Sequence, residues 1–298
     1  MSEGVVPTLA ELVALRAGVG RRSPSRHGRL GAAGQAPSPM RGRGMEYAES
    51  REYSPGDDAR HIDWRLTART GRAHTKLFQA ERERLSLIVA DTAPALYFGT
   101  RVRFKSVQAA RVGAVAAWAA VRDGDRVAAV SAIAGEAPVA PGSGPRGALR
   151  VIDALVRWYA GPSPGTERLD VAIDHARRLL RPGSRLLVLG DAASVATVPD
   201  ARWPALAYEH EVVVLLMTDP LETEPPRMSL PFALGERRVE LDLGANTQRE
   251  RWQQAFSAPV DELLQRLPRQ GVRVQAISTV DASESWLGLL GRARPQVA

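Results

Sequence analysis

The sequence predicts an α/β protein with a doubly wound, mostly parallel, Rossmann-like sheet, preceded by a β-ribbon and a short N-terminal helix. Apolar runs such as SLIVA and VVVLLM are typical of strands that are covered on both faces. Segments with helical character stand between these runs, and this alternation favours parallel strands joined by helices. The chain has 298 residues, of which 44% are hydrophobic, so it is long enough to bury a sizeable core.

Residues 1–44 are expected to form a short helix and a flexible linker. Leucine and valine recur at helical spacing between Pro7 and Arg16. The residues that follow are rich in Gly, Pro, Ser and Arg without any period, which is typical of an unfolded segment. Seven arginines and no acid lie between Leu12 and Met45, and they account for the whole net charge of +7. We therefore expect no basic nucleic-acid-binding face on the folded part; an alternative is that the linker itself binds nucleic acid or an acidic membrane surface.

Residues 45–84 are predicted to form an antiparallel β-ribbon. The segment MEYAESREY alternates like a strand, and SPGDD is typical of a turn. The segment HTKLF, which continues into QAERE, predicts a second strand. The two strands are expected to pair around the loop between Pro55 and Asp63.

Residues 85–298 are predicted to form the domain that contains the sheet. The segment 237–243 is expected to be an edge strand, and 272–279 to close the sheet. A helix over 246–271 is expected to break at Pro259. The other predicted strands are 84–91, 125–134, 184–191 and 212–219, and the other predicted helices are 104–122, 144–160, 167–180 and 204–211.

Composition narrows the class of protein further. No cysteine is present, which excludes disulfides, thiolate zinc sites and cysteine nucleophiles. The longest apolar run, from Val112 to Val121, is too short for a membrane-spanning helix of about 20 residues. The N-terminal segment contains Glu3 and Glu11 and lacks an apolar stretch of the length found in signal peptides. We expect a soluble, cytoplasmic protein.

Three residues are expected at the carboxyl ends of the predicted strands. Asp91 ends the first core strand, Asp191 ends a later one, and Thr166 lies in a Pro/Gly loop before a helix. In doubly wound sheets, ligands bind at this edge. Oxygen ligands from three loops would suit a hard cation such as Mg²⁺. For each residue alone the simpler interpretation is structural, because an Asp at a strand end often caps the next helix.

The segment REYSPGDDARHIDWRLTARTGRAHTKLFQAERE, followed by a strand that ends in Asp, resembles bacterial domain-of-unknown-function family 58. The similarity in β/α order extends from about Met45 to the C-terminus. The residues that match the pattern of the family are Arg51, Tyr53, Pro55, Gly56, Asp57, Asp58, Arg60, Ile62, Asp63, Trp64, Ala68, Arg69, Lys76, Phe78 and Glu81.

This resemblance implies a von Willebrand factor A-like domain and a partnership with a MoxR-type AAA+ ATPase, beside which such proteins are commonly encoded. It also implies a metal-ion-dependent adhesion site, which uses Asp-x-Ser-x-Ser, a Thr and a further Asp. Asp91, Thr166 and Asp191 resemble these contributions, but alanines (Ala93 and Ala95) replace both serines. The resemblance therefore implies a degenerate site that is poor in Mg²⁺.

The charged motif from Arg51 to Trp64 has two interpretations. As a structural or docking element, its acids would be neutralised by arginines, and Tyr53, Ile62 and Trp64 would give it an apolar side for packing. Perturbed charge clusters also occur in structural networks. We therefore expect a non-enzymatic interaction module, an adaptor or assembly factor for the ATPase. The alternative is a metal-dependent hydrolase, whose cluster would consist of Asp57, Asp58, His61 and Asp63.

Overall fold

The computed structural model describes residues 4–20, 45–80, 84–163, 165, 168–234 and 237–290. The chain forms two compact units. The smaller unit is Pro24–Glu83, and the larger unit combines Met1–Ser23 with Arg84–Ala298. Among the described residues, no helix combines the length and the apolar character needed to cross a bilayer.

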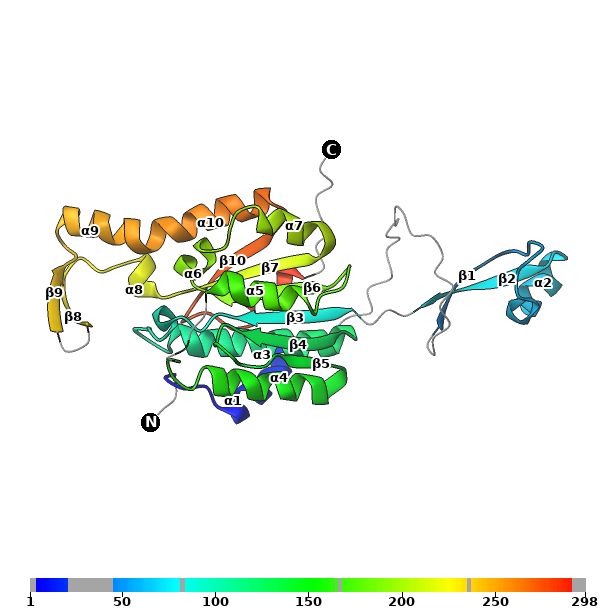
Figure 1. The fold of residues 1–298 in the computed structure, drawn as a ribbon, viewed down its shortest axis with the longest axis horizontal. Helices are drawn as coiled ribbons and strands as arrows, with labels where there is room; N and C mark the ends of the chain where they lie inside the picture. Colours follow the sequence, from blue (N-terminus) through cyan, green and yellow to red (C-terminus); the bar gives the residue numbers. More distant parts are fainter. Residues whose placement is uncertain are drawn as a thin grey trace. The chain divides into compact units, whose positions relative to one another are not determined.

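A six-stranded sheet forms the centre of the larger unit, with the strand order β10-β7-β6-β3-β4-β5 (Figure 1). The first five strands in this order are mutually parallel, and only β5 pairs antiparallel with its neighbour β4. The prediction of a mostly parallel sheet in an α/β protein is confirmed. The strands are β3 (Leu85–Ala90), β4 (Arg126–Ser131), β5 (Val139–Gly142), β6 (Arg185–Gly190), β7 (Glu211–Thr218) and β10 (Arg273–Ser278).

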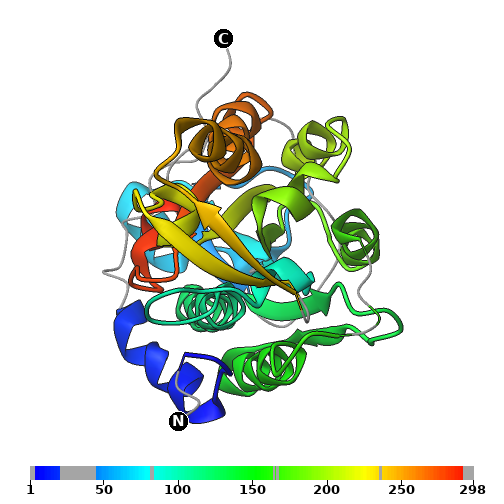
Figure 2. The same ribbon diagram turned by 90° about the vertical axis from the view of Figure 1, so that its left-hand side faces the viewer.

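Helices cover both faces of this sheet, and Figure 2 shows the resulting three layers. One face packs on α1, α3, α4 and the short helix that contains Trp286. The other face packs on α5, α6, α7 and α10. The helices are α1 (Leu9–Ala14), α3 (Lys105–Asp123), α4 (Gly144–Trp158), α5 (Leu169–Arg177), α6 (Ala192–Ala196), α7 (Arg202–Glu209), α8 (Pro220–Thr223), α9 (Asn246–Trp252) and α10 (Ala258–Arg269), with shorter turns at Leu15–Val19, Pro94–Leu96, Gln253–Ser257 and Ser285–Leu289.

The N-terminal helix α1 belongs to the larger unit. Its cap residue Thr8 accepts a hydrogen bond from the backbone N–H of Glu11 at 3.3 Å. Leu12 is fully buried, and its carbonyl accepts a hydrogen bond from the indole of Trp118 on α3 at 3.3 Å. Glu11 also forms an ion pair with Arg111 of α3. The helix predicted at the start of the chain is thus attached to the sheet domain.

The prediction that 237–243 forms an edge strand of the central sheet is wrong, because this segment does not pair with the sheet. Residues Arg237–Asp242 form β9, which pairs antiparallel with β8 (Ser229–Leu234) in a separate hairpin. Strands β8 and β9 are adjacent in the sequence, so they can pair with each other through a short hairpin connection instead of joining the edge of the central sheet. Phe232 of β8 contacts Trp252 of α9, with ring centroids 5.4 Å apart. Figure 2 shows the yellow hairpin across the front of the larger unit.

An ion-pair network lies at the amino ends of the strands. Arg185, at the start of β6, is 3% exposed and contacts Glu211 at 3.0 Å and Asp123 at 3.3 Å. Arg84 contacts both Asp125 and Glu211 at 3.0 Å. The network therefore joins the starts of β3, β4, β6 and β7 with the end of α3.

The smaller unit contains an antiparallel β-ribbon. Strands β1 (Met45–Glu52) and β2 (His74–Ala80) pair antiparallel, with one irregularity between Tyr47 and Glu49. Between them lie a short 3-10 turn (Ala59–His61) and the helix α2 (Trp64–Thr70), which was not predicted. Asp63 caps α2 by accepting a hydrogen bond from the N–H of Leu66 at 3.1 Å. Gly71, with φ +73°, ends the helix in the left-handed conformation that suits glycine.

Candidate functional site

The carboxyl ends of the parallel strands meet at one edge of the sheet, which we call the carboxyl-end face. Because β3 lies between β4 and β6, its junction with β6 is the topological switch point of the sheet. Asp91 follows β3 and Asp191 follows β6, so the structure brings these two predicted residues to the same edge. The third predicted residue, Thr166, lies outside the described residues.

Asp91 is a buried carboxyl group with few partners. It is 1% exposed, and its Oδ1 accepts a hydrogen bond from the backbone N–H of Ala93 at 2.9 Å. Its Oδ2 accepts no hydrogen bond within the described part of the chain. Burial raises the pKa of Asp91 to about 6, and the nearby charge of Asp191 adds to the rise.

Asp191 acts as a helix cap. Its Oδ1 accepts a hydrogen bond from the backbone N–H of Ser194 at 2.9 Å, in the first turn of α6. Its Oδ2 lies 3.7 Å from the ammonium of Lys105. Asp191 therefore has the structural role expected of an Asp at a strand end, that of a helix cap. The same carboxylate also lies beside the ammonium of Lys105.

Lys105 supplies a buried positive charge at the carboxyl-end face. It is the first residue of α3 and 3% exposed. Its Nζ lies 2.6 Å from Oε1 of Glu222 on α8, which is 8% exposed. Burial raises the pKa of Glu222, and the ammonium of Lys105 partly opposes this rise. The side chain of Lys105 thus bridges two acids, Asp191 and Glu222, from separate loops.

Asp219, after β7, connects the other loops of this face. Its carboxylate accepts hydrogen bonds from the Thr100 backbone N–H at 3.0 Å, from the Thr100 hydroxyl at 2.5 Å and from the Thr279 hydroxyl at 2.7 Å. Burial alone would raise the pKa of Asp219, but these hydrogen bonds outweigh it and the pKa lies below its usual value. Asp219 therefore holds the loop after β3 against the ends of β7 and β10.

The described residues do not fit a Mg²⁺ ion at this face. They contain no group of three His, Asp or Glu side chains that could hold a metal. The ammonium of Lys105 already contacts Asp191 and Glu222, and it would repel a divalent cation placed beside it. The loop after Asp91 offers alanines where two hydroxyl ligands would be required. No chemistry that depends on a metal follows from this arrangement.

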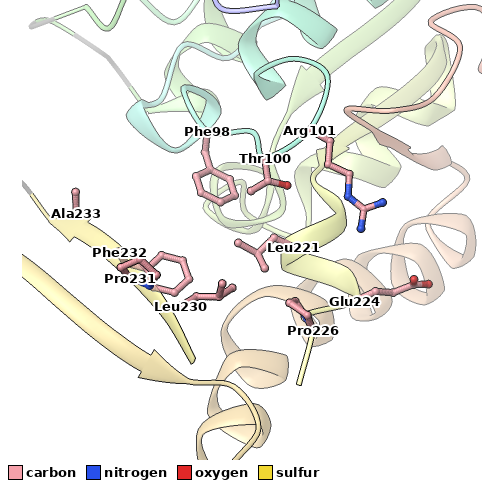
Figure 3. A pocket seen from close by; sticks show the side chains of 10 residues that line it. All are labelled: Phe98, Thr100, Arg101, Leu221, Glu224, Pro226, Leu230, Pro231, Phe232 and Ala233. Atoms are coloured by element: carbon pink, nitrogen blue, oxygen red, sulfur yellow. The ribbon is translucent and has the colours of Figure 1, made fainter. Parts of the chain in front are cut away.

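A pocket of about 470 Å³ opens at the carboxyl-end face, between the loop after β3, the α8 region and strand β8 (Figure 3). Phe98, Leu221 and Phe232 provide much of its apolar wall, and Arg101 and Glu224 stand on the other side. Neither Arg101 nor Glu224 forms an ion pair with another described residue. The volume is within the range of pockets that hold small ligands or a protruding side chain.

In the charged motif, the first two carboxylates form ion pairs. Asp57 contacts Arg51 at 2.6 Å and Asp58 contacts Arg60 at 3.0 Å. The backbone N–H of Ser54 and the guanidinium of Arg51 lower the pKa of Asp57. Hydrogen bonds from Arg60 lower the pKa of Asp58 to about 2. These two carboxylates are thereby held charged and engaged.

The remaining motif residues shape the loop. Pro55 and Gly56 form its turn, with Gly56 at φ +110°, and the Tyr53 hydroxyl donates a hydrogen bond to the Asp57 carbonyl at 3.3 Å. Asp63 caps α2 and also accepts a hydrogen bond from the Ser50 hydroxyl at 3.0 Å. The acids proposed for a hydrolase thus have structural partners in the described part of the chain.

Comparison with known proteins shows the family. Residues 49–285 match the family described as "Protein of unknown function DUF58". The chain belongs to this family. The uncharacterized protein Rv1480 of Mycobacterium tuberculosis and the uncharacterized protein Mb1516 of Mycobacterium bovis are each 30% identical to this DUF58 chain over 187 residues. The aligned region covers 62% of this chain and 58% of each mycobacterial protein.

One expectation for the DUF58 motif is wrong. Trp64 was expected to pack with Tyr53 and Ile62, but it is 70% exposed. Trp64 is the first residue of α2, and the inward side of this short helix is taken by Leu66 and Thr67. Its indole therefore faces solvent.

Sequence reasoning missed Lys105, Glu222 and Asp219 as members of the carboxyl-end face. Two signals were available. Asp219 ends the predicted strand 212–219, as Asp91 and Asp191 end theirs, and Lys105 is one of only two lysines among 40 basic residues, at the start of a helix whose second half is almost entirely apolar. No signal pointed to Glu222, which is 117 positions away in the sequence.

Proposed function

We propose that this DUF58 protein is a non-enzymatic interaction module, an adaptor or assembly factor that works with a MoxR-type AAA+ ATPase in the cytoplasm. The observation that carries the proposal is the Lys105 ammonium between Asp191 and Glu222. Its positive charge offsets part of the negative charge of these two buried acids, at the edge of the sheet where ligands of such folds bind. Lys105 thus supplies, from within the protein, positive charge that a bound metal ion would otherwise bring to this face.

The pocket beside this cluster supports docking of a protein. Phe98, Leu221 and Phe232 can enclose an apolar side chain, while Arg101 and Glu224 offer charges at the rim. Protein interfaces concentrate their binding energy in pockets of this kind, with polar groups around them. The docking surface in this proposal is therefore the carboxyl-end face, including the pocket.

The class of partner rests on the family resemblance. The charged motif and the strand ending in Asp91 resemble proteins with a von Willebrand factor A-like domain that accompany MoxR-type ATPases. Such a domain with an intact adhesion site would bind partners through Mg²⁺. Here, Lys105 would take over the electrostatic role of the ion, which makes the site a degenerate adhesion site.

The test is co-purification of this chain with a MoxR-type ATPase encoded in the same genome, with and without ATP and Mg²⁺. We expect a complex that survives size-exclusion chromatography in at least one nucleotide state. We also expect manganese titration of this chain alone, followed by electron paramagnetic resonance, to show no tight binding. Absence of binding in every nucleotide state would contradict the proposed partnership, and tightly bound manganese that is lost in Asp191→Asn would contradict the role of Lys105.

A further inference from the structure

Trp64 differs from the other tryptophans of the chain. The sequence contains six tryptophans. The five in the larger unit are between 0 and 8% exposed, whereas Trp64 on α2 of the smaller unit is 70% exposed. A large indole left in water costs the protein the gain that burial would give. Single exposed apolar residues are common, so Trp64 needs a second observation before it indicates a site.

The second observation is the charge that surrounds Trp64. Arg65 and Arg69 are exposed on the same short helix, four positions apart, with Ala68 between them and also exposed. Neither arginine forms an ion pair with another described residue. We call the exposed side of α2, made of Trp64, Arg65, Ala68 and Arg69, the α2 face.

The acids that could neutralise these two arginines are engaged elsewhere. Among the described side chains of the smaller unit, Asp57 pairs with Arg51 at 2.6 Å, Asp58 with Arg60 at 3.0 Å, and Glu52 with Arg72 at 3.0 Å. The remaining described carboxylate, that of Asp63, caps α2. Within the described residues the α2 face therefore keeps two positive charges beside an exposed aromatic ring.

We propose that the α2 face binds an acidic segment of a partner protein, with an apolar side chain against the Trp64 indole and carboxylates on Arg65 and Arg69. The guanidinium group matches a carboxylate through two parallel hydrogen bonds. Tryptophan and arginine are also the residues most enriched where binding energy concentrates in protein interfaces. This surface lies in the smaller unit, and the proposal is independent of the ATPase partnership.

Charge favours a protein over a nucleic acid as the partner. Residues 45–80 contain six basic and six acidic side chains, so the ribbon has no net charge. Nucleic-acid binding usually depends on several phosphate contacts from a strongly basic surface. Two exposed arginines on a ribbon without net charge, beside an exposed indole, suit a segment that carries a pair of carboxylates and one apolar residue.

The experiment uses the full chain labelled with 5-fluorotryptophan. Fluorine NMR should show six tryptophan signals, and Trp64→Phe identifies that of Trp64. The probe is a short synthetic peptide of glutamate and leucine. Two matched peptides carry lysine for glutamate, or serine for leucine, and oligothymidine and phosphatidylglycerol vesicles are tested in parallel.

We expect the glutamate–leucine peptide to shift the Trp64 signal and leave the five buried tryptophans unchanged. Both matched peptides should bind at least fivefold more weakly. The double variant Arg65→Glu with Arg69→Glu should weaken binding of the probe about tenfold or more, which corresponds to two lost charge pairs and two new repulsions. A control with the same charge change, Arg146→Glu with Arg150→Glu, reverses two exposed arginines of α4 at the same spacing and should bind like the wild type.

Three results would overturn the proposal. The first is a Trp64 signal that stays unchanged at millimolar concentrations of the probe. The second is an α4 control variant that weakens binding as much as the α2 variant does. The third is a shift of the Trp64 signal by oligothymidine or by the vesicles at a lower concentration than the acidic peptide requires. The partner would then be a nucleic acid or a membrane.

Discussion

At Asp91, burial raises the pKa of the carboxyl group, whereas the Ser194 side chain and backbone N–H groups, that of Ala93 among them, lower it. Burial is the stronger effect and raises the pKa from 3.8 to about 6. A group whose pKa is raised in the folded state contributes stability that is fully present below the unfolded pKa. This contribution is lost as pH rises through the folded pKa. The protein should therefore become less stable between pH 4 and pH 7 on account of Asp91.

The variant Asp91→Asn tests this directly, because asparagine keeps an oxygen that accepts the Ala93 hydrogen bond but cannot ionise. We expect its free energy of unfolding, relative to the wild type, to increase by about 2–3 kcal/mol between pH 4 and pH 7, since a pKa unit corresponds to about 1.4 kcal/mol. Urea denaturation at a series of pH values measures the difference. A difference that does not change with pH would show that Asp91 has an ordinary pKa.

Lys105 stands between two carboxylates and is nearly inaccessible to water. Removing it in Lys105→Met leaves the Glu222 carboxylate buried without its cation, and we expect the free energy of unfolding to fall by about 3–5 kcal/mol. The double variant Lys105→Met with Glu222→Gln should recover most of this loss, because the unpaired charge is gone. Chemical denaturation of the three proteins decides the point. If the single variant is as stable as the wild type, the ion pair does not form in solution.

Among the elements, the starts of the strands are joined by buried charges. Asp125 is 5% exposed and accepts hydrogen bonds from Arg84 at 3.0 Å and from Ser86 at 2.6 Å. We expect Asp125→Ala to lower the free energy of unfolding by about 2–4 kcal/mol, because buried donors lose their acceptor. On α4, the exposed pair of Asp153 with Arg157 provides the control. Asp153→Ala should cost less than about 1 kcal/mol in the same denaturation experiment.

The sequence predicts the elements better than it predicts their contacts. Strands such as β7 are recognisable because an unbroken apolar run has one physical explanation, burial on both faces. The strand-end position of Asp191 follows from the same reasoning. The helix α2 was missed because seven residues of mixed polarity show no period, and the pairing of Lys105 with Glu222 depends on a tertiary approach that no local pattern records. The correction at β9 has a different origin, because β9 pairs in a local hairpin with β8, the strand that directly precedes it in the sequence.

For the whole molecule, two surfaces carry the functional hypotheses. The carboxyl-end face of the larger unit combines the cluster of Lys105 with Asp191 and Glu222 and an apolar pocket. The α2 face of the smaller unit combines an exposed indole with two arginines. These surfaces predict different partners, and each can be altered without touching the other. Family membership is established by the match over residues 49–285, and the partners are hypotheses for experiment.

The most direct test of the account is the dissociation constant between this protein and the purified MoxR-type ATPase, measured for one variant that fills the pocket. Ala233 lines the pocket and is exposed, so Ala233→Arg adds a bulky charge and removes little packing. Ala205→Arg, on the exposed side of α7, is the matched control. We expect Ala233→Arg to weaken binding about tenfold or more and Ala205→Arg to bind like the wild type. Equal binding by the two variants would contradict docking at the carboxyl-end face.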